Sequence, residues 1–283
     1  MPELPEVETI RLGLAPVLTG RRFEEVRILD ARLTRPEPPE EVEARLTSQR
    51  VETVRRRGKY LIVELSSGDH LLVHLRMTGS FRFGGADGVS ADPHLRAVVS
   101  LDDGSDVVYR DVRRFGTWLV LERDELEGYV AARLGPEPLA PAFTAASLAA
   151  SLAGRRAPVK AVLLDQRAVA GVGNIYADEA LWRARVRPER PALSLDRAEV
   201  KALHRGVRAA LRAGIARQGA TLRDYRDPSG APGTMQDAFR VYGRDGEPCP
   251  RCRATIAKTR VGGRGTWFCP VCQGTARAGA RSR

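Results

Sequence analysis

The cysteines constrain the fold of this chain more than any other feature. They form two Cys-x2-Cys pairs separated by sixteen residues, and the four are Cys249, Cys252, Cys269 and Cys272. This spacing is typical of a four-cysteine zinc site, in which each pair supplies two thiolates to one tetrahedral ion. Because four thiolates leave no open coordination position, we predict one structural Zn²⁺. Two disulfides or free thiols are the alternatives.

The segment between the two cysteine pairs, RATIAKTRVGGRGTWF, predicts a strand, a glycine turn and a second strand. Such a hairpin is too small to have a core of its own, so bound metal would stabilise it. Arg264 lies among Gly262, Gly263 and Gly265 at the tip. A bare backbone with one guanidinium can reach nucleic-acid phosphates, although a solvated turn has the same composition.

The charge of the chain favours a polyanionic partner. Its 283 residues contain 46 Lys and Arg against 35 Asp and Glu, a formal net charge of +11. An excess of this size is typical of nucleic-acid-binding proteins, although a solvated basic surface would also explain it. The opening MPELPEVET has no secretory apolar run, and no apolar run of about 18 residues could span a membrane. We therefore expect a cytosolic protein that binds no membrane.

Apolar periodicity divides the chain into a β-rich part and a helical part. PEVETIRLGLAPVLTG predicts a helix with Pro5 at its first position. Between residues 61 and 120, the turns SSGD and DDGS join strand patterns into two hairpins. LGPEPLAPAF then predicts a linker, and four segments between residues 147 and 219 have helical spacing: SLAASLAG, PVKAVLLDQ, NIYADEALWRAR and DRAEVKALHRGVRAALRAGIARQG. A loop, RDPSGAPGTMQ, follows, and QGTARAGARSR predicts a disordered basic tail.

The N-terminus offers a candidate nucleophile. If Met1 is removed, Pro2 has a free secondary amine, which can attack an aldehyde-level carbon and form an iminium. A reference α-amino group has a pKa of roughly 7.7 to 8.0, so a useful fraction is neutral near pH 7. Most N-terminal prolines have no such role. Lys59 begins the strand KYLIVEL, where a lysine is usually solvated or prevents edge pairing, and chemistry is the alternative.

Two segments that follow strands, HLRMTGSFRF and DVRRFG, contain Met77, Arg113 and Phe115. One exposed apolar side chain would mean little, because such residues are common on protein surfaces. Apolar wedges together with a cation, however, can fill the space that a nucleic-acid base leaves when it is extruded from the stack.

The segment GVGNIYADEAL predicts a helix whose start can bind a phosphate. Asn174 is a good N-cap, and Gly171 and Gly173 would let an anion approach backbone N–H groups. Helix capping alone would also explain the asparagine.

Taken together, these segments resemble the formamidopyrimidine-DNA glycosylases, relatives of the endonuclease VIII type. The resemblance runs from residue 1 to about residue 273. It rests on the collinear motifs PELPEVET, RRGKYL, HLRMTGS, RRFG, LGPEPL, GVGNIYADEAL, VYGRDGEPCPRC and GRGTWFCPVC. Within the family, LPEVE is more similar to the branch that acts on oxidised guanine.

The resemblance implies an α+β fold. Residues 1–134 would form a catalytic β-sandwich flanked by helices, and residues 135–143 a linker. Residues 144–238 would form a helix–two-turn–helix DNA-binding domain, in which residues 218–236 cover the extruded base. A zinc-bound β-hairpin at 239–273 and a basic tail at 274–283 would complete the chain.

The resemblance also implies a bifunctional enzyme of base-excision repair. It would excise oxidised purines, such as 8-oxoguanine and formamidopyrimidines, and cleave the abasic site by β,δ-elimination. Pro2 would form the Schiff base, Glu3 would transfer protons, Lys59 would assist beside the lesion, and Arg264 would contact phosphates during the second elimination. DNA contacts are implied for Met77, Arg113, Phe115, Arg155, Lys160, Asn174, Arg223 and Tyr225.

The expected partner is double-stranded DNA with oxidised bases or abasic sites, bound by a monomer in the bacterial cytosol at the nucleoid. Arg76 and Val112 replace the small residue and the proline usual in the family, Arg155 replaces a lysine, and Asp92 stands where relatives often have a histidine. Two alternatives stay open. One is the same fold with a preference for oxidised pyrimidines, and the other is a zinc-hairpin DNA-binding protein without catalysis.

Overall fold

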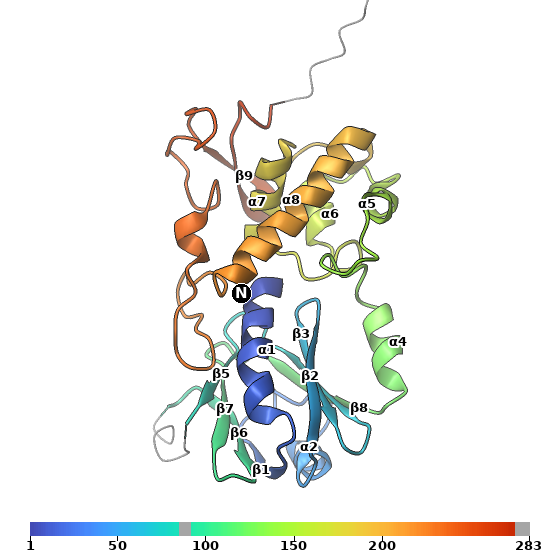
Figure 1. Cartoon of the computed structure of the whole chain (residues 1–283), viewed down its shortest axis with the longest axis vertical. Helices are drawn as coiled ribbons and strands as arrows, with labels where there is room; N and C mark the ends of the chain where they lie inside the picture. The colour runs from blue at the N-terminus through green and yellow to red at the C-terminus, as the bar shows by residue number, and fades with distance from the viewer. Residues whose placement is uncertain (85–91, 275–283) are drawn as a thin grey trace, which may run out of the picture. The chain divides into compact units, whose positions relative to one another are not determined.

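The computed structural model describes residues 1–84 and 92–274, and the chain divides into two compact units (Figure 1). The first contains Met1–Arg133 and Gly214–Gln236, and the second contains Leu134–Ala213 and the chain from Asp237 onward. The predicted basic tail lies outside the described residues except for Gly274. In the described part of the chain, no helix is long and apolar enough to cross a membrane.

The first unit is a sandwich of two antiparallel four-stranded sheets. The strands of one sheet, in order, are β1 (Phe23–Ile28), β6 (Leu95–Leu101), β7 (Asp106–Arg110) and β5 (Ser80–Phe83). Those of the other are β2 (Val51–Arg57), β3 (Tyr60–Leu65), β4 (His70–His74) and β8 (Thr117–Leu121). The two hairpins that the sequence predicts are β3–β4 and β6–β7.

The sandwich buries one continuous apolar core. Phe23, Val63, Val99 and Trp118, from strands of both sheets, belong to the same buried cluster. Helix α1 (Leu4–Leu18) adds its predicted apolar face to this cluster and packs against β2 and β3. Figure 1 shows α1 lying along the sandwich. Two further helices, α2 (Pro39–Leu46) and α4 (Glu125–Ala131), flank the sheets.

Residues 214–236 group with the sandwich, a placement that the sequence did not indicate. The Ala220 N–H donates to Glu6 Oε1 over 2.8 Å, and Arg82 Nη1 donates to the Asp227 carbonyl over 2.9 Å. A Cβ on Gly13 in α1 would lie 3.1 Å from Pro228, so this loop lies directly on the helix. Part of the segment predicted to cover the base is therefore anchored to α1 and β5.

The second unit is helical and ends in a β-hairpin. Its helices are α5 (Ala145–Leu152), α6 (Val159–Leu164), α7 (Asn174–Ala184) and most of α8 (Arg197–Ala216). Two short 3₁₀ helices, η1 (Ala192–Ser194) and η2 (Met235–Ala238), precede and follow α8. The hairpin pairs β9 (Ala257–Val261) with β10 (Arg264–Phe268), as the sequence predicts.

The stretch expected as a linker is packed within the second unit. The Gly135 N–H donates to the Gln166 carbonyl over 2.8 Å, and the Ala170 N–H donates to the Pro136 carbonyl over 3.1 Å. A Cβ on Gly135 would lie 2.2 Å from the Arg167 carbonyl oxygen, so only glycine allows this approach. The boundary between the units therefore precedes this segment, at Leu134.

Candidate functional sites

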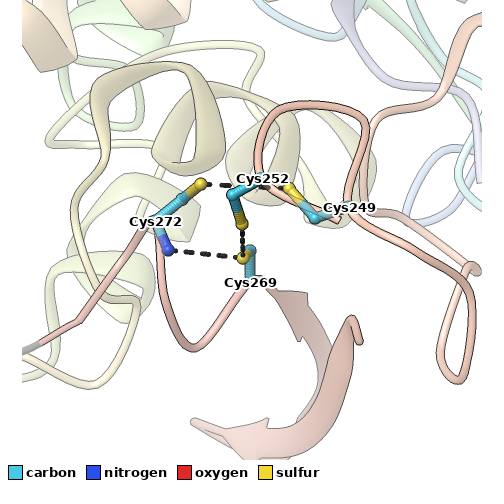
Figure 2. Close-up of side chains that lie close together, drawn as sticks. All are labelled: Cys249, Cys252, Cys269 and Cys272. Carbon is cyan, nitrogen blue, oxygen red and sulfur yellow. Dashed lines mark hydrogen bonds between the residues drawn. The ribbon is translucent and has the colours of Figure 1, made fainter. Parts of the chain in front are cut away.

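The four cysteines form a compact cluster. Their Sγ atoms all lie within 4.8 Å of one another, and the side chains converge (Figure 2). The Sγ–Sγ distances are 3.9 Å for Cys249 and Cys272 and 3.5 Å for Cys252 and Cys269. Sulfurs bound tetrahedrally to zinc at about 2.3 Å lie about 3.8 Å apart, whereas a disulfide requires about 2.05 Å. The geometry therefore fits a metal centre and excludes the disulfide alternative.

N–H donors surround these thiols. Trp182 Nε1 lies 3.4 Å from Cys249 Sγ, and the Cys272 N–H donates to Cys269 Sγ over 3.3 Å. Such bonds stabilise the thiolate form that binds metal. Because Trp182 lies on α7, its bond also ties the metal site to a helix of the second unit.

A buried ion pair attaches the zinc hairpin to α6 and α7. Lys160 and Asp178 have fully buried side chains, with 2.7 Å between Lys160 Nζ and Asp178 Oδ1. The same ammonium donates to the Gly265 carbonyl over 2.9 Å and to Thr266 Oγ1 over 2.8 Å. Asp178 Oδ2 accepts the Trp267 N–H over 3.0 Å. Burial raises the pKa of Asp178 to about 7, although the Lys160 charge lowers it.

This arrangement changes the role expected for Lys160. Its ammonium is surrounded by protein acceptors and is 0% exposed. We therefore assign it to the internal attachment of the hairpin rather than to a direct phosphate contact. The sequence pattern that could have revealed this is the pair Asp178–Glu179 within an apolar helix, because a buried carboxylate needs a cation or N–H donors.

The turn before α7 differs from the expected phosphate loop. The helix begins at Asn174, and Gly173 is its N-cap. Asn174 does not cap the helix, since its Nδ2 donates to the Gly265 carbonyl in the hairpin over 3.0 Å. The Gly171 N–H donates to Gln166 Oε1 over 2.9 Å. Gln166, which sequence reasoning missed, also donates to the Val172 carbonyl and so braces the turn internally.

The hairpin tip projects one cation. Gly262 and Gly263 have φ angles of 55° and 76°, as a two-residue type I′ turn requires. Arg264, directly after them, is exposed. Arg155, another expected DNA contact, is partly exposed and donates to Asp165 Oδ2 over 2.8 Å.

The N-terminal residues are held in place by an acidic side chain. Pro2 is buried, and Glu3 is 2% exposed. Glu6, also 2% exposed, accepts the Glu3 N–H at Oε2 over 2.8 Å and the Ala220 N–H at Oε1. Its carboxylate therefore links the start of α1 to the loop at 220. This is the reciprocal half of a capping box, a signature readable from the spacing of Glu3 and Glu6.

Lys59 lies in the tight turn between β2 and β3 and is only 6% exposed, so it is not a solvated edge residue. Gly58 beside it has φ 57°. Arg56 donates to the Gly58 carbonyl over 3.0 Å and to Glu8 Oε2 over 2.9 Å. The turn that carries Lys59 is therefore tied to α1, the helix that begins just after Pro2 and Glu3.

Met77, Arg113 and Phe115, the residues expected to fill the space of an extruded base, are called the wedge residues below. They lie on two loops of the sandwich. Met77 follows β4 and is partly buried, whereas Arg113 and Phe115 follow β7 and are exposed. The Arg113 guanidinium lies 4.8 Å from the Phe115 ring centroid, a cation–π distance. The Arg113 N–H donates to Thr78 Oγ1 over 3.0 Å, so the two loops are in direct contact.

Of the two residues assigned to the covering loop, Arg223 is exposed and Tyr225 is partly buried. Tyr225 packs against the sandwich core, and its hydroxyl donates to the Glu6 carbonyl over 3.4 Å. Burial raises the pKa of Tyr225 well above its usual value. Gly219, with φ 81°, would place a Cβ 2.8 Å from Glu6 Cγ, which explains the glycine there.

Comparison with known proteins accounts for most of the chain. Family models match residues 1–118 as a formamidopyrimidine-DNA glycosylase N-terminal domain and 134–226 as the H2TH domain. Residues 246–274 match a zinc finger found in FPG and IleRS. A formamidopyrimidine-DNA glycosylase of Roseiflexus sp. (strain RS-1) is 48% identical, covering 96% of this chain and 100% of the relative. The chain belongs to the formamidopyrimidine-DNA glycosylase family.

Similarity to other formamidopyrimidine-DNA glycosylases supports the same family assignment. The protein of that name from Chloroflexus aurantiacus is 44% identical over 96% of this chain and 98% of its own length. A Lactococcus lactis FPG variant in complex with Fapy-dG-containing DNA matches with a TM-score of 0.91 and 36% identity, covering 97% of this chain and 100% of that chain. The family and the α+β fold predicted from the motifs are confirmed, and the cysteine cluster is the zinc site of this family's finger, with one structural zinc.

Proposed function

We propose that this protein is a base-excision-repair DNA glycosylase that removes oxidised purines from double-stranded DNA and cleaves the resulting abasic site. The observation that carries the proposal is end-to-end similarity to formamidopyrimidine-DNA glycosylases in a chain that begins Met-Pro-Glu. The net charge of +11 suits a DNA ligand. Lactococcus lactis relatives are in complex with DNA containing Fapy-dG or an abasic site.

In the proposed reaction, removal of Met1 frees the Pro2 secondary amine. Its nitrogen bonds to the anomeric carbon of the damaged nucleotide as the glycosidic bond breaks and the base leaves with a proton. Glu3, at the start of α1, exchanges protons during opening of the sugar ring, since the sugar carbon develops positive charge that a carboxylate stabilises. Lys59 assists proton transfer beside the lesion.

The resulting iminium drives strand cleavage. It accepts the electrons that remain when the neighbouring sugar proton is removed, so the 3′ phosphate leaves in the β-elimination and the 5′ phosphate in the δ-elimination. Arg264, exposed at the hairpin tip, contacts phosphates and supports the second elimination. The zinc has no part in these steps, because four thiolates leave it no open position. It holds the hairpin that presents Arg264.

DNA binding is assigned to exposed and partly exposed side chains of both units. Met77, Arg113 and Phe115 fill the space left by the extruded base, which costs a few kcal/mol to unstack. Arg155, which pairs with Asp165, and Asn174, the first residue of α7, contribute to phosphate binding. Arg223 and Tyr225 belong to the loop that covers the extruded base. Tyr225 lies in the part of this loop that contacts α1.

A cleavage panel tests the proposal. Duplexes with 8-oxoguanine, a formamidopyrimidine, an oxidised pyrimidine or a preformed abasic site are incubated with the zinc-loaded protein. We expect excision of both purine lesions, strand products with phosphate at both ends, and loss of all of these in Pro2→Gly. Faster excision of the oxidised pyrimidine would favour the endonuclease VIII-like alternative, which gains some support from a Lactococcus lactis Fpg complex with oxidised-pyrimidine DNA. Binding without any cleavage would contradict the proposal.

A further inference from the structure

A buried carboxylate joins the two loops that carry the wedge residues. Asp111 follows β7 and is 1% exposed. Its Oδ1 accepts the Thr78 hydroxyl and, over 3.1 Å, the Arg113 N–H. Its Oδ2 accepts the Phe115 N–H over 2.9 Å and the Gly116 N–H over 2.7 Å. One side chain thus receives four hydrogen bonds, from the loop after β4 and from its own loop.

The donors to Asp111 either are wedge residues or are adjacent to them in the sequence. Thr78 directly follows Met77, and the bonds to Arg113 and Phe115 come from their own backbone N–H groups. Because both carboxylate oxygens are used, a shift of either loop would break bonds to the same buried group. Buried charge without its donors is costly, so the two loops are held in one relative position.

A tyrosine beneath the carboxylate fits the same two loops together. Tyr109 is 0% exposed, and its hydroxyl lies where a Cβ on Gly79 or Gly116 would approach to 2.2 or 2.0 Å. Both loops therefore need a glycine over this hydroxyl. Phe81 and Trp118 both pack edge-on against the Tyr109 ring, with centroids 5.1 and 5.4 Å away, so Tyr109 is part of the sandwich core.

We infer that Asp111 is a positioning residue for base extrusion: it fixes the Met77 loop against the Arg113–Phe115 loop so that the three side chains enter the DNA stack as one unit. The inference rests on the proposed function. Asp111 acts through the wedge residues and touches neither the sugar nor Pro2 in the proposed reaction. A misplaced wedge slows extrusion, whereas the elimination chemistry at Pro2 does not depend on it.

The substitution Asp111→Asn tests this with almost no change in shape. An amide has one acceptor oxygen, so either the Thr78 and Arg113 donors or the Phe115 and Gly116 donors must face an NH₂ group. Thr78→Val removes the hydroxyl bond alone, and Thr78→Ser restores it. The matched control is Asp106→Asn at the start of β7, where the carboxylate accepts the Ser100 hydroxyl over 2.7 Å.

Each variant is assayed by single-turnover excision of paired 8-oxoguanine, by cleavage of a preformed abasic site, and by fluorescence of 2-aminopurine placed beside the lesion. In Asp111→Asn we expect 8-oxoguanine excision to fall roughly 10- to 100-fold, as loss of precise positioning typically costs. Abasic-site cleavage should stay within about threefold of wild type on the same reasoning. The 2-aminopurine rise should slow in parallel with excision, and Thr78→Ser and Asp106→Asn should match wild type.

Other outcomes overturn the inference. An unchanged excision rate in both Asp111→Asn and Thr78→Val would show that the bonds do not position the wedge. An equal loss of activity on the 8-oxoguanine duplex and on the preformed abasic site would assign Asp111 to general folding. If Asp111→Asn does not fold, the inference requires that Thr78→Val slow extrusion, and an unchanged rate in that variant overturns it. If wild type cleaves neither substrate, the proposed function fails, a result distinct from failure of the Asp111 variants alone.

Discussion

The buried pair of Lys160 and Asp178 gives the sharpest test of how the zinc hairpin is held. In Lys160→Met, the chain keeps a side chain of similar length but loses the ammonium that contacts Asp178, Gly265 and Thr266. Asp178 would keep its bond from the Trp267 N–H of the hairpin, and its carboxylate is 0% exposed. The substitution therefore leaves a buried carboxyl group, a carbonyl and a hydroxyl without their cation.

The expected magnitude follows from that count. Removing one partner of a buried ion pair costs about 3–5 kcal/mol, because the remaining charge is uncompensated. Replacing both partners by apolar residues is far less costly, since no charge remains buried. We therefore expect Lys160→Met to destabilise the second unit by about 3–5 kcal/mol, and Lys160→Met with Asp178→Leu to recover at least half of this. Lys201→Met, at an exposed position on α8, should change stability by less than about 0.5 kcal/mol.

Urea unfolding followed by circular dichroism measures these differences in the free energy of unfolding. A colorimetric chelator reports zinc release. The variant should release zinc at lower urea concentration, because the hairpin loses its attachment to α6 and α7. The salt dependence of DNA binding separates this role from a phosphate contact. Loss of a direct contact lowers the slope of log K against log salt by about 0.9, whereas we expect no change. Unchanged stability with a lowered slope would refute the reasoning.

Three further predictions concern other residues. Arg76 has φ 52°, a left-handed conformation that costs a non-glycine residue about 1–2 kcal/mol. Arg76→Gly should therefore raise the free energy of unfolding by up to about 1 kcal/mol. A lower free energy of unfolding in a urea titration would contradict this. Burial, together with the nearby charges of Arg76 and Lys59, lowers the pKa of His74 from 6.5 to about 3. The unfolded ring therefore binds a proton below about pH 6.5 that the folded ring does not, and His74 should reduce stability as pH falls toward 3, by up to about 1.4 kcal/mol per unit. His74→Asn, which keeps an acceptor for the Arg76 N–H, should flatten this slope, and an equally steep slope in the variant would exclude His74 as the cause. Chelating the zinc, or Cys269→Ala, should unfold the hairpin and abolish DNA binding while the sandwich keeps its own melting transition; retained binding would show that the finger is dispensable.

Much of the fold was readable because local patterns were unambiguous. The apolar alternation of β3 and β4 and of β6 and β7, each pair joined by a turn of polar residues and glycine, predicted both hairpins. The cysteine spacing predicted the metal site. Strands β1 and β2 were missed because their sequences, FEEVRI and VETVRRR, are dominated by charged residues on the solvent side. Their strand character comes from pairing within the sheets and not from local propensity.

The candidate sites were readable as a set of residues but not as a set of contacts. Motifs pointed to Lys160 and Asn174, yet both side chains bond to Gly265, about ninety or more positions away in the chain. The roles of Asp111 and Gln166 could not be predicted from the sequence, because a single polar residue in a loop has no distinctive local pattern. Their roles depend on which backbone N–H groups the fold brings to them, and that information is tertiary.

The central claim is that the Pro2 nitrogen bonds covalently to the deoxyribose of the damaged nucleotide. The most direct measurement is borohydride reduction during incubation with 8-oxoguanine duplex, followed by proteolysis and mass mapping of the adduct. We expect a stable protein–DNA complex whose added mass lies on an N-terminal peptide that begins at Pro2 and lacks Met1. An adduct on Lys59 or another lysine, or strand cleavage by protein that retains Met1, would contradict the account.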